Sequence, residues 1–172
     1  TKLNVKIKRD SKEYEINFSA GDKDNDLKSI GDVGATNSGT TIRFYPDKQY
    51  FETLEINKKS LKHLLKAKAV LCPGLQIDYF DEKKNERIKW IFDEGLSDYL
   101  DEFSGCNEKL LDETIILSKT SDDQALDVAV NWTEEASNNL LKETYVNLIP
   151  TALGGSHLNG FKSGLLEAIK EF

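Results

Sequence analysis

Two short stretches of this chain combine glycine with side chains that could bind a ligand. In the first, Thr40 follows Gly39, and Ile42 comes two positions later in an alternating segment. A threonine hydroxyl can donate and accept hydrogen bonds, so beside an apolar side chain it could contact the polar edge of a ligand in a pocket. Composition alone favours a simpler interpretation, in which Gly39 and Thr40 form a turn that enters a strand.

The second stretch is Gly154-Gly155-Ser156-His157, which precedes a helical pattern. A helix that begins after two glycines presents free amides and the positive end of its dipole, so it could attract an anion. A structural role is favoured, because Ser156 or Asn159 can cap the helix, His157 can bond neighbouring backbone, and the glycines allow close approach. A serine nucleophile activated by His157 is disfavoured, since adjacent side chains point in different directions and no third acid is marked as an orienter.

The elements that would position the first stretch begin with strands. Residues 3–7 and 14–18 alternate apolar and polar side chains, which predicts a two-stranded hairpin. Residues 21–38 are polar and contain glycine, which predicts a loop or irregular strand before a strand over 41–45. The first third of the chain is therefore expected to be a β meander.

An amphipathic helix is predicted after the meander. Asn57 or Ser60 can cap it, and the Cys-Pro-Gly segment 72–74 stops it. Its apolar face carries Leu61, Leu64 and Leu65. Its basic side chains are Lys58, Lys59, Lys62, Lys66 and Lys68. These could touch nucleic acid, but a solvated helix face is the favoured interpretation. His63, among these lysines, is interpreted as a surface or boundary residue.

A second hairpin is predicted from strands over 75–80 and 87–92, joined by the charged segment 81–86, which is interpreted as a solvated turn. Near residue 93 the pattern changes to helical spacing over 96–103, and we predict a domain boundary there. The polar stretch 104–108 follows this helix.

The second region, residues 94–172, is predicted to be α+β with antiparallel strands. Strands are expected over 114–117, 126–132 and 144–149. A C-terminal helix is expected from an apolar stripe made of Leu158, Phe161, Leu165, Ile169 and Phe172.

Composition limits the class of protein. The chain has 172 residues, of which 38% are hydrophobic and 31% charged, as is ordinary for globular domains. Its net charge of −7 disfavours a surface that binds DNA by bulk neutralisation of phosphates.

Cys72 and Cys106 lack the spacing of a zinc site or redox dithiol, so both are expected to be free thiols. No apolar run reaches the roughly 20 residues that span a bilayer, and the cytoplasm is the expected compartment.

Five segments together carry a resemblance to a known family. They are SGTTIRFYPD (38–47), LKHLLKAKAVLCPG (61–74), DEGLSDYL (93–100), ETYVNLIPT (143–151) and LGGSHLNGFK (153–162). In this order they resemble the ATPase subunits of type IIA topoisomerases, the gyrase B family, and most specifically the B subunits of bacterial topoisomerase IV. Cys72-Pro73-Gly74 stands where gyrase B subunits typically have Asn-Gly. The resemblance spans essentially the whole chain.

This resemblance implies a fold for each part. Residues 1–93 resemble the later half of a GHKL ATPase domain, the Bergerat fold, and residues 94–172 resemble the first half of a transducer domain with a ribosomal-protein-S5-like fold. The acid-bearing helix, the phosphate lid and the Gln-Thr-Lys loop of the family are absent from the sequence. The chain is therefore expected to be an internal fragment that is inactive alone.

The resemblance also implies site residues. Thr40 matches a threonine that recognises adenine together with an aspartate and a water, and Ile42 lines the same pocket. Arg9 matches an arginine at the mouth of the pocket that contacts coumarin inhibitors. No catalytic residue or metal ligand is expected in this chain. Ser156 stands where most relatives have threonine, and Lys162 and Lys170 are expected to face the DNA gate.

The implied activity belongs to an intact ATPase subunit. It would bind ATP and Mg²⁺, form a homodimer of B subunits, pair with the A subunit of topoisomerase IV, and drive passage of one DNA duplex through another in decatenation and relaxation. The fragment itself is expected to bind neither ATP nor Mg²⁺, or to bind nucleotide only weakly. A gyrase B fragment and a non-enzymatic interaction module that binds through exposed strand edges are the alternatives.

Overall fold

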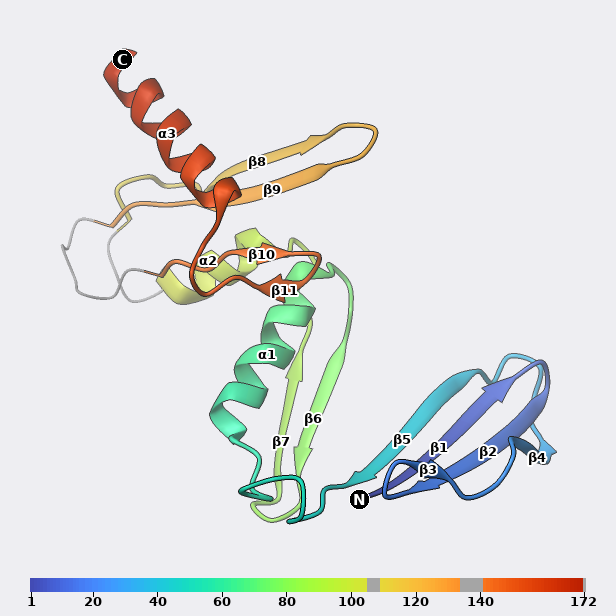
Figure 1. Ribbon diagram of the computed structural model, residues 1–172. Coiled ribbons are helices and arrows are strands. Elements are labelled where there is room, and N and C mark those ends of the chain that lie inside the picture. The colour runs from blue at the N-terminus through green and yellow to red at the C-terminus, as the bar shows by residue number, and fades with distance from the viewer. Residues whose placement is uncertain (105–108, 134–140, 172) are drawn as a thin grey trace. The chain divides into compact units, whose positions relative to one another are not determined.

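The computed structural model describes residues 1–104, 109–133 and 141–171 and is an α+β protein (Figure 1). It divides into two compact units, Thr1–Asn57 and Lys58–Phe172. This division differs from the boundary predicted near residue 93 from the change to helical spacing, and that boundary stays a prediction.

The first unit is a five-stranded antiparallel sheet. Its strands are β1 (Lys2–Arg9), β2 (Lys12–Ser19), β3 (Asp22–Lys23), β4 (Lys28–Asp32) and β5 (Gly39–Tyr45). Their order is β3-β2-β1-β5, and β4 also pairs with β2. The predicted β1–β2 hairpin is confirmed, with Asp10 and Ser11 at positive φ in its two-residue turn. Residues 21–38, predicted to be a loop or irregular strand, contain the short strands β3 and β4.

One face of this sheet is apolar. Val5 pairs with Ile16 on β2 and with Ile42 on β5, and Leu3 and Ile7 continue the same face, because side chains alternate along a strand. None of residues 1–57 is buried, and Ile42 remains 65% exposed. The unit therefore presents an open apolar face and an open polar face.

The second unit begins with helix α1 (Lys58–Leu71), followed by the hairpin β6 (Ile77–Asp81) and β7 (Glu86–Trp90) (Figure 1). The helix ends as predicted, and the amide of Gly74, at φ 79°, donates to the carbonyl of Phe92 at 3.0 Å. The predicted apolar face is partly wrong, because Leu64 is exposed while the smaller Ala67, Ala69 and Val70 are buried.

The core of the second unit forms where α1 meets the next helix, α2 (Leu96–Ser104). Ala69, Val70 and Phe92 are buried, and four partly buried side chains pack on them: Ile77, Trp90, Leu96 and Tyr99. Gly95 allows this approach, because it has φ 56° and an added Cβ would lie 3.0 Å from the carbonyl oxygen of Val70.

The remaining elements are two hairpins and a helix. The strands predicted over 114–117 and 126–132 are confirmed as β8 (Ile115–Thr120) and β9 (Ala125–Val130), which pair antiparallel. The single strand expected over 144–149 is wrong, because Asn147 and Leu148 adopt positive φ and fold it into the small hairpin β10 (Tyr145–Val146) and β11 (Ile149–Pro150). Helix α3 (Ser156–Glu171) is confirmed, but its described residues bury none of the expected stripe, and Phe172 lies outside them.

Candidate functional site

Two of the three predicted nucleotide-site residues, Arg9 and Thr40, lie toward one end of the sheet of the first unit, and Ile42 lies at the middle of β5. Lys8 of β1 pairs with Gly39 of β5 and Ile7 pairs with Thr40, so Arg9 and Thr40 come from neighbouring strand ends. Alternation puts Thr40 and Ile42 on the apolar face of the sheet. The structure thus brings these residues to one face of the sheet.

This surface is open within residues 1–57. The Arg9 side chain is 79% exposed, and its Nε lies 3.5 Å from a carboxylate oxygen of Asp10. Thr40 is exposed as well. An exposed hydroxyl beside an exposed isoleucine could form one wall for a planar ligand with a polar edge, but a closed pocket needs a second wall. The assignment of Thr40, Ile42 and Arg9 to a nucleotide site therefore stays a prediction.

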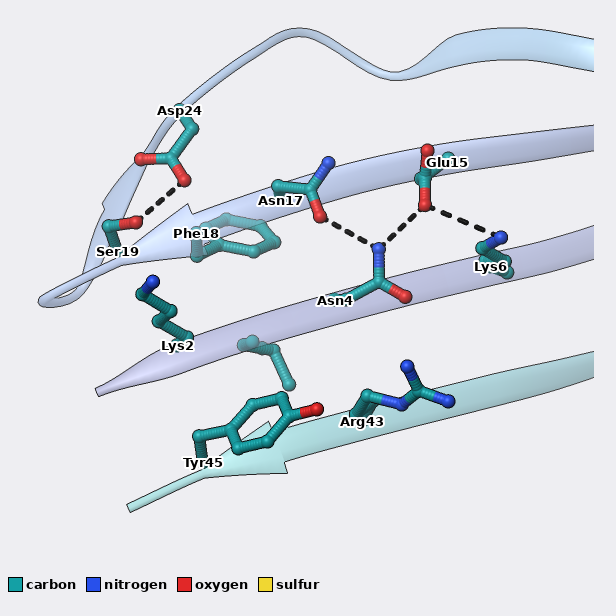
Figure 2. A pocket seen from close by; sticks show the side chains of 11 residues that line it. Lys2, Asn4, Lys6, Glu15, Asn17, Phe18, Ser19, Asp24, Arg43 and Tyr45 are labelled. Atoms are coloured by element: carbon teal, nitrogen blue, oxygen red, sulfur yellow. Dashed lines mark hydrogen bonds and ion pairs between the residues drawn. The ribbon is translucent and has the colours of Figure 1, made fainter. Parts of the chain in front are cut away.

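A shallow polar cavity of about 390 Å³ lies on the other face of the same sheet (Figure 2). At its centre the side-chain amide of Asn4 donates to Glu15 Oε1 and to Asn17 Oδ1, both at 2.7 Å, and Lys6 Nζ lies 3.6 Å from the same Glu15 oxygen. Figure 2 shows Arg43 along the neighbouring strand. The cavity contains none of the three predicted site residues, and Lys6 and Glu15 of its lining pair with each other.

The lysines of α1 make specific contacts, contrary to the predicted solvated face. Lys58 pairs with Asp81, which is only 6% exposed, so the interpretation of segment 81–86 as a solvated turn is wrong at Asp81. The hydrogen bond from Lys58 holds the pKa of the Asp81 carboxyl below its usual value, and the same bond raises the pKa of Lys58.

The pattern continues along the helix at four-residue spacing. Lys62 Nζ lies 2.6 Å from a carboxylate oxygen of Glu86, and Lys66 Nζ lies 2.8 Å from one of Glu102. Lys66 also sits over the rings of Phe92 and Tyr99. This lysine stripe (Lys58, Lys62 and Lys66) ties α1 to the β6–β7 hairpin and to α2, while Lys59 remains exposed as predicted.

The carboxylate of Glu143, which was not predicted as a site residue, contacts side chains from three elements. Glu143, just before β10, accepts hydrogen bonds from Tyr99 of α2 at 3.2 Å and Tyr145 of β10 at 2.6 Å, and His63 Nε2 of α1 lies 3.4 Å from it. Partial burial, and then the charge and hydrogen bond of Glu143, raise the pKa of Tyr99 to about 12. The only local sequence signal was the Glu-x-Tyr spacing, because His63 and Tyr99 reach Glu143 through the fold.

The Gly-Gly-Ser-His block is structural in its described contacts. An added Cβ on Gly155 would lie 2.9 Å from the His157 ring, so the imidazole occupies the space that a side chain would take. His157 Nε2 lies 3.3 Å from Thr151 Oγ1, which confirms a neighbouring partner for this ring, although the partner is a side chain. Thr151 in turn bonds Thr144, across the base of the β10–β11 hairpin.

Among the described residues, no three His, Cys, Asp or Glu side chains gather as a metal site would require. Cys72 is a free thiol as predicted, and Cys106 lies outside the described residues. None of the helices formed by the described residues has the length and apolar character needed to cross a bilayer.

Comparison with known proteins assigns the family. The family model for DNA gyrase B matches residues 95–172. Over its full length the chain is 44% identical to the B subunit of DNA topoisomerase 4 from Pseudomonas aeruginosa, and over 171 residues it is 42% identical to that of Escherichia coli. It spans about 27% of the length of either relative.

Solved structures agree with this assignment. The topoisomerase IV ATP-binding domain of Francisella tularensis, in complex with a small-molecule inhibitor, superposes with a TM-score of 0.79 at 42% identity, over 99% of this chain and 45% of that one. The 43K ATPase domain of Thermus thermophilus gyrase B, in complex with an aminocoumarin, gives a TM-score of 0.83 at 25% identity, over 99% of this chain and 46% of that one. The predicted resemblance is confirmed: the chain belongs to the family of topoisomerase IV and gyrase B subunits.

Proposed function

We propose that this chain is a segment of the ATPase subunit of a bacterial topoisomerase IV, in which ATP binding and hydrolysis drive the passage of one DNA duplex through another. The observation that carries the proposal is the 44% identity to the B subunit of a topoisomerase 4 across the whole chain. In this proposal residues 1–93 are the later half of a GHKL ATPase domain and residues 94–172 are the first half of its transducer.

The first unit would supply one wall of the nucleotide site. Thr40 would hydrogen-bond the polar edge of adenine, Ile42 would cover the base, and Arg9 would lie at the mouth. The common sheet end of Arg9 and Thr40 and the exposure of all three side chains support this arrangement. The phosphates and Mg²⁺, which would neutralise phosphate charge when bound, would be held by residues of the longer subunit.

The chain alone would not turn over ATP, because one wall without the phosphate-binding elements cannot orient the reaction. In the longer subunit we expect dimerisation with a second copy, assembly with the A subunit of topoisomerase IV, action on DNA and a cytoplasmic location. The described second unit would pass the nucleotide state from the ATPase region toward those partners.

Calorimetric titration of this chain with a non-hydrolysable ATP analogue and Mg²⁺, beside an aminocoumarin, tests the incomplete site. Binding weaker than that of the longer subunit, or none, is expected. Binding of the analogue as tight as in the longer subunit would overturn the claim of a broken site. The longer subunit carrying this sequence should hydrolyse ATP, and together with its A subunit it should decatenate DNA.

A matched pair of variants tests the residue assignment in that longer subunit. Thr40→Val should weaken nucleotide binding, because it removes the hydroxyl while keeping the shape. Thr41→Val is the control, since alternation turns Thr41 to the opposite face of β5. Equal loss of nucleotide binding in both variants would show that any change in β5 weakens binding, and it would contradict a specific role for the Thr40 hydroxyl.

A gyrase B subunit is the second candidate, because gyrase B relatives also align over nearly the whole chain, at 33% identity in Archaeoglobus fulgidus. Introduction of negative supercoils by the longer subunit with its partner would favour gyrase. Decatenation and relaxation without supercoiling would favour topoisomerase IV.

A further inference from the structure

Three elements of the second unit converge on a single carboxylate. Glu143 lies 3.4 Å from His63 on α1, accepts from Tyr99 on α2 at 3.2 Å, and accepts from Tyr145 on β10 at 2.6 Å. Its side chain is 22% exposed. We call these four residues (His63, Tyr99, Glu143 and Tyr145) the Glu143 joint. Figure 1 shows the β10–β11 hairpin and α2 at the C-terminal end of α1.

Both oxygens of the carboxylate are engaged, so the joint has a defined geometry. Tyr99 and His63 share Oε1, and Tyr145 takes Oε2. Both phenols are protonated donors at neutral pH, and partial burial and Glu143 itself raise the pKa of each further above its ordinary value of 10. Hydrogen bonds to an ionised acceptor are about twice as strong as neutral ones.

The same hairpin is tied to α1 at a second point and to α3 at a third. Lys68 of α1 donates to the carbonyl oxygen of Leu148 in the β10–β11 turn. At the base of the hairpin Thr151 bonds Thr144, and His157 in the first turn of α3 lies 3.3 Å from Thr151. A continuous set of polar contacts therefore runs from α1 through the hairpin to α3.

We propose that Glu143 is a positioning residue that couples α1 to α2 and to the β10–β11 hairpin, so that a change in the position of α1 is passed to the hairpin. The functional meaning rests on the proposed function, in which α1 belongs to the ATPase part and the hairpin to the transducer. The coupling itself is a property of this chain.

Two other charged side chains near the Glu143 joint, Lys66 and Lys68, make contacts that differ from those of Glu143. Lys66 sits 5.2 Å from the centre of the Tyr99 ring and pairs with Glu102, so α1 and α2 keep a contact that does not involve Glu143. Lys68 contacts a backbone carbonyl and not the carboxylate. Within the part of the chain that the structure describes, Glu143 is thus the side chain that joins α1, α2 and β10 through polar contacts.

A double-mutant cycle tests the coupling. His63→Gln and Tyr145→Phe alter residues that meet through Glu143, and the hydrogen exchange of backbone amides in α1 and the hairpin is measured for each. The effects should be non-additive in the parent chain and additive in the Glu143→Gln background. Additive effects in the parent chain would overturn the proposal.

Glu143→Gln alone gives a second readout. Exchange should accelerate about tenfold in α1, α2 and the hairpin together, as expected for loss of a charged hydrogen-bond acceptor, and not in β8–β9. Glu167→Gln, which removes a charge from an exposed position of α3, is the matched control. Removal of the charge should also lower the pKa of Tyr99 below its value of about 12. Acceleration confined to the hairpin would contradict coupling.

The longer subunit separates this inference from the proposed function. Glu143→Gln should leave its basal ATP hydrolysis unchanged and reduce nucleotide-dependent duplex passage. A parent subunit without ATP hydrolysis would refute the proposed function, while the cycle in this chain would still decide the coupling. Normal duplex passage by Glu143→Gln would overturn the role of the joint as a relay.

Discussion

Lys58, in the first turn of α1, reaches across to the buried carboxylate of Asp81 at the end of β6. The Asp81 side chain is only 5% exposed, whereas that of Lys58 is 39% exposed. The carboxylate also accepts the backbone amide of Lys83 at 3.1 Å, which closes the β6–β7 turn. One side chain thus fixes both the start of the helix and the turn of the hairpin.

Asp81→Asn should destabilise the second unit more than Glu102→Gln does. The first change removes the ionised partner of Lys58 at a buried position, whereas Glu102 pairs with Lys66 while 58% exposed and screened by solvent. Chemical denaturation of the chain, followed by far-ultraviolet circular dichroism, measures both. Equal effects would show that burial of Asp81 adds nothing to its ion pair.

Acid should remove the stabilisation that the Lys58–Asp81 ion pair gives to the folded chain. The pKa of Asp81 is lowered in the folded chain by the hydrogen bond from Lys58, from an ordinary value of 3.8. A carboxyl whose pKa is lower in the folded chain than in the unfolded chain stabilises the fold at pH values above its unfolded pKa. This stabilisation is lost as the pH falls below 3.8 toward the folded pKa. The free energy of unfolding, measured from neutral pH downward, should therefore fall less steeply in Asp81→Asn than in the parent. Parallel curves would contradict this.

The sequence predicted the elements whose side-chain period is unbroken. Period and turn chemistry predicted the β1–β2 hairpin and helix α1 with its stop at residues 72–74. Period also predicted strands β8 and β9, but not that they pair. The strand over 144–149 failed because its turn is made by Asn147 and Leu148 at positive φ, a conformation that leucine rarely adopts and that pattern does not reveal.

The candidate sites were less predictable, because they depend on contacts between distant residues. Thr40 and Arg9 were identified through family resemblance, and pairing of β1 with β5 accounts for their common sheet end. Asp81 looked like a solvated turn residue, since a charge run carries no sign of the lysine 23 positions away that pairs with it. For the same reason the only local signal for Glu143 was the Glu-x-Tyr spacing, which does not point to His63 or Tyr99.

Alkaline pH should weaken the second unit through Tyr99. Its pKa rises from 10 to about 12, chiefly because of partial burial and then because of Glu143. A phenol whose pKa is higher in the folded chain than in the unfolded chain stabilises the fold at pH values below its unfolded pKa. This stabilisation is lost as the pH rises from 10 to about 12. Tyr99→Phe should be less stable than the parent at neutral pH, and its stability should fall less between these pH values.

Phenolate absorbance and denaturation, followed along the same titration, measure the two effects. Tyr45→Phe is the control, because Tyr45 is 53% exposed and lies in the first unit. A parent and a Tyr99→Phe variant with equal alkaline losses would rule out the contribution of Tyr99.

Substitution by alanine should lower the stability of the chain at Gly154, just before α3, and raise it at Gly160, inside α3. Gly154 has φ 77°, and an added Cβ would lie 2.9 Å from Leu158 Cδ2, so Gly154→Ala should cost about 1 kcal/mol or more. Gly160 lies inside the helix with nothing within 4 Å of an added Cβ, so Gly160→Ala should stabilise it by about 0.5–1 kcal/mol.

Thermal denaturation of the two alanine variants beside the parent chain decides between a structural and an anion-binding role for the glycines. If Gly154 serves the turn, the loss in Gly154→Ala should be the same with and without added phosphate, because the cost lies in backbone conformation. If the glycines hold an anion, phosphate should stabilise the parent chain and not the Gly154→Ala variant. The described contacts of this block, from the His157 ring against Gly155 to its bond with Thr151, favour the first result.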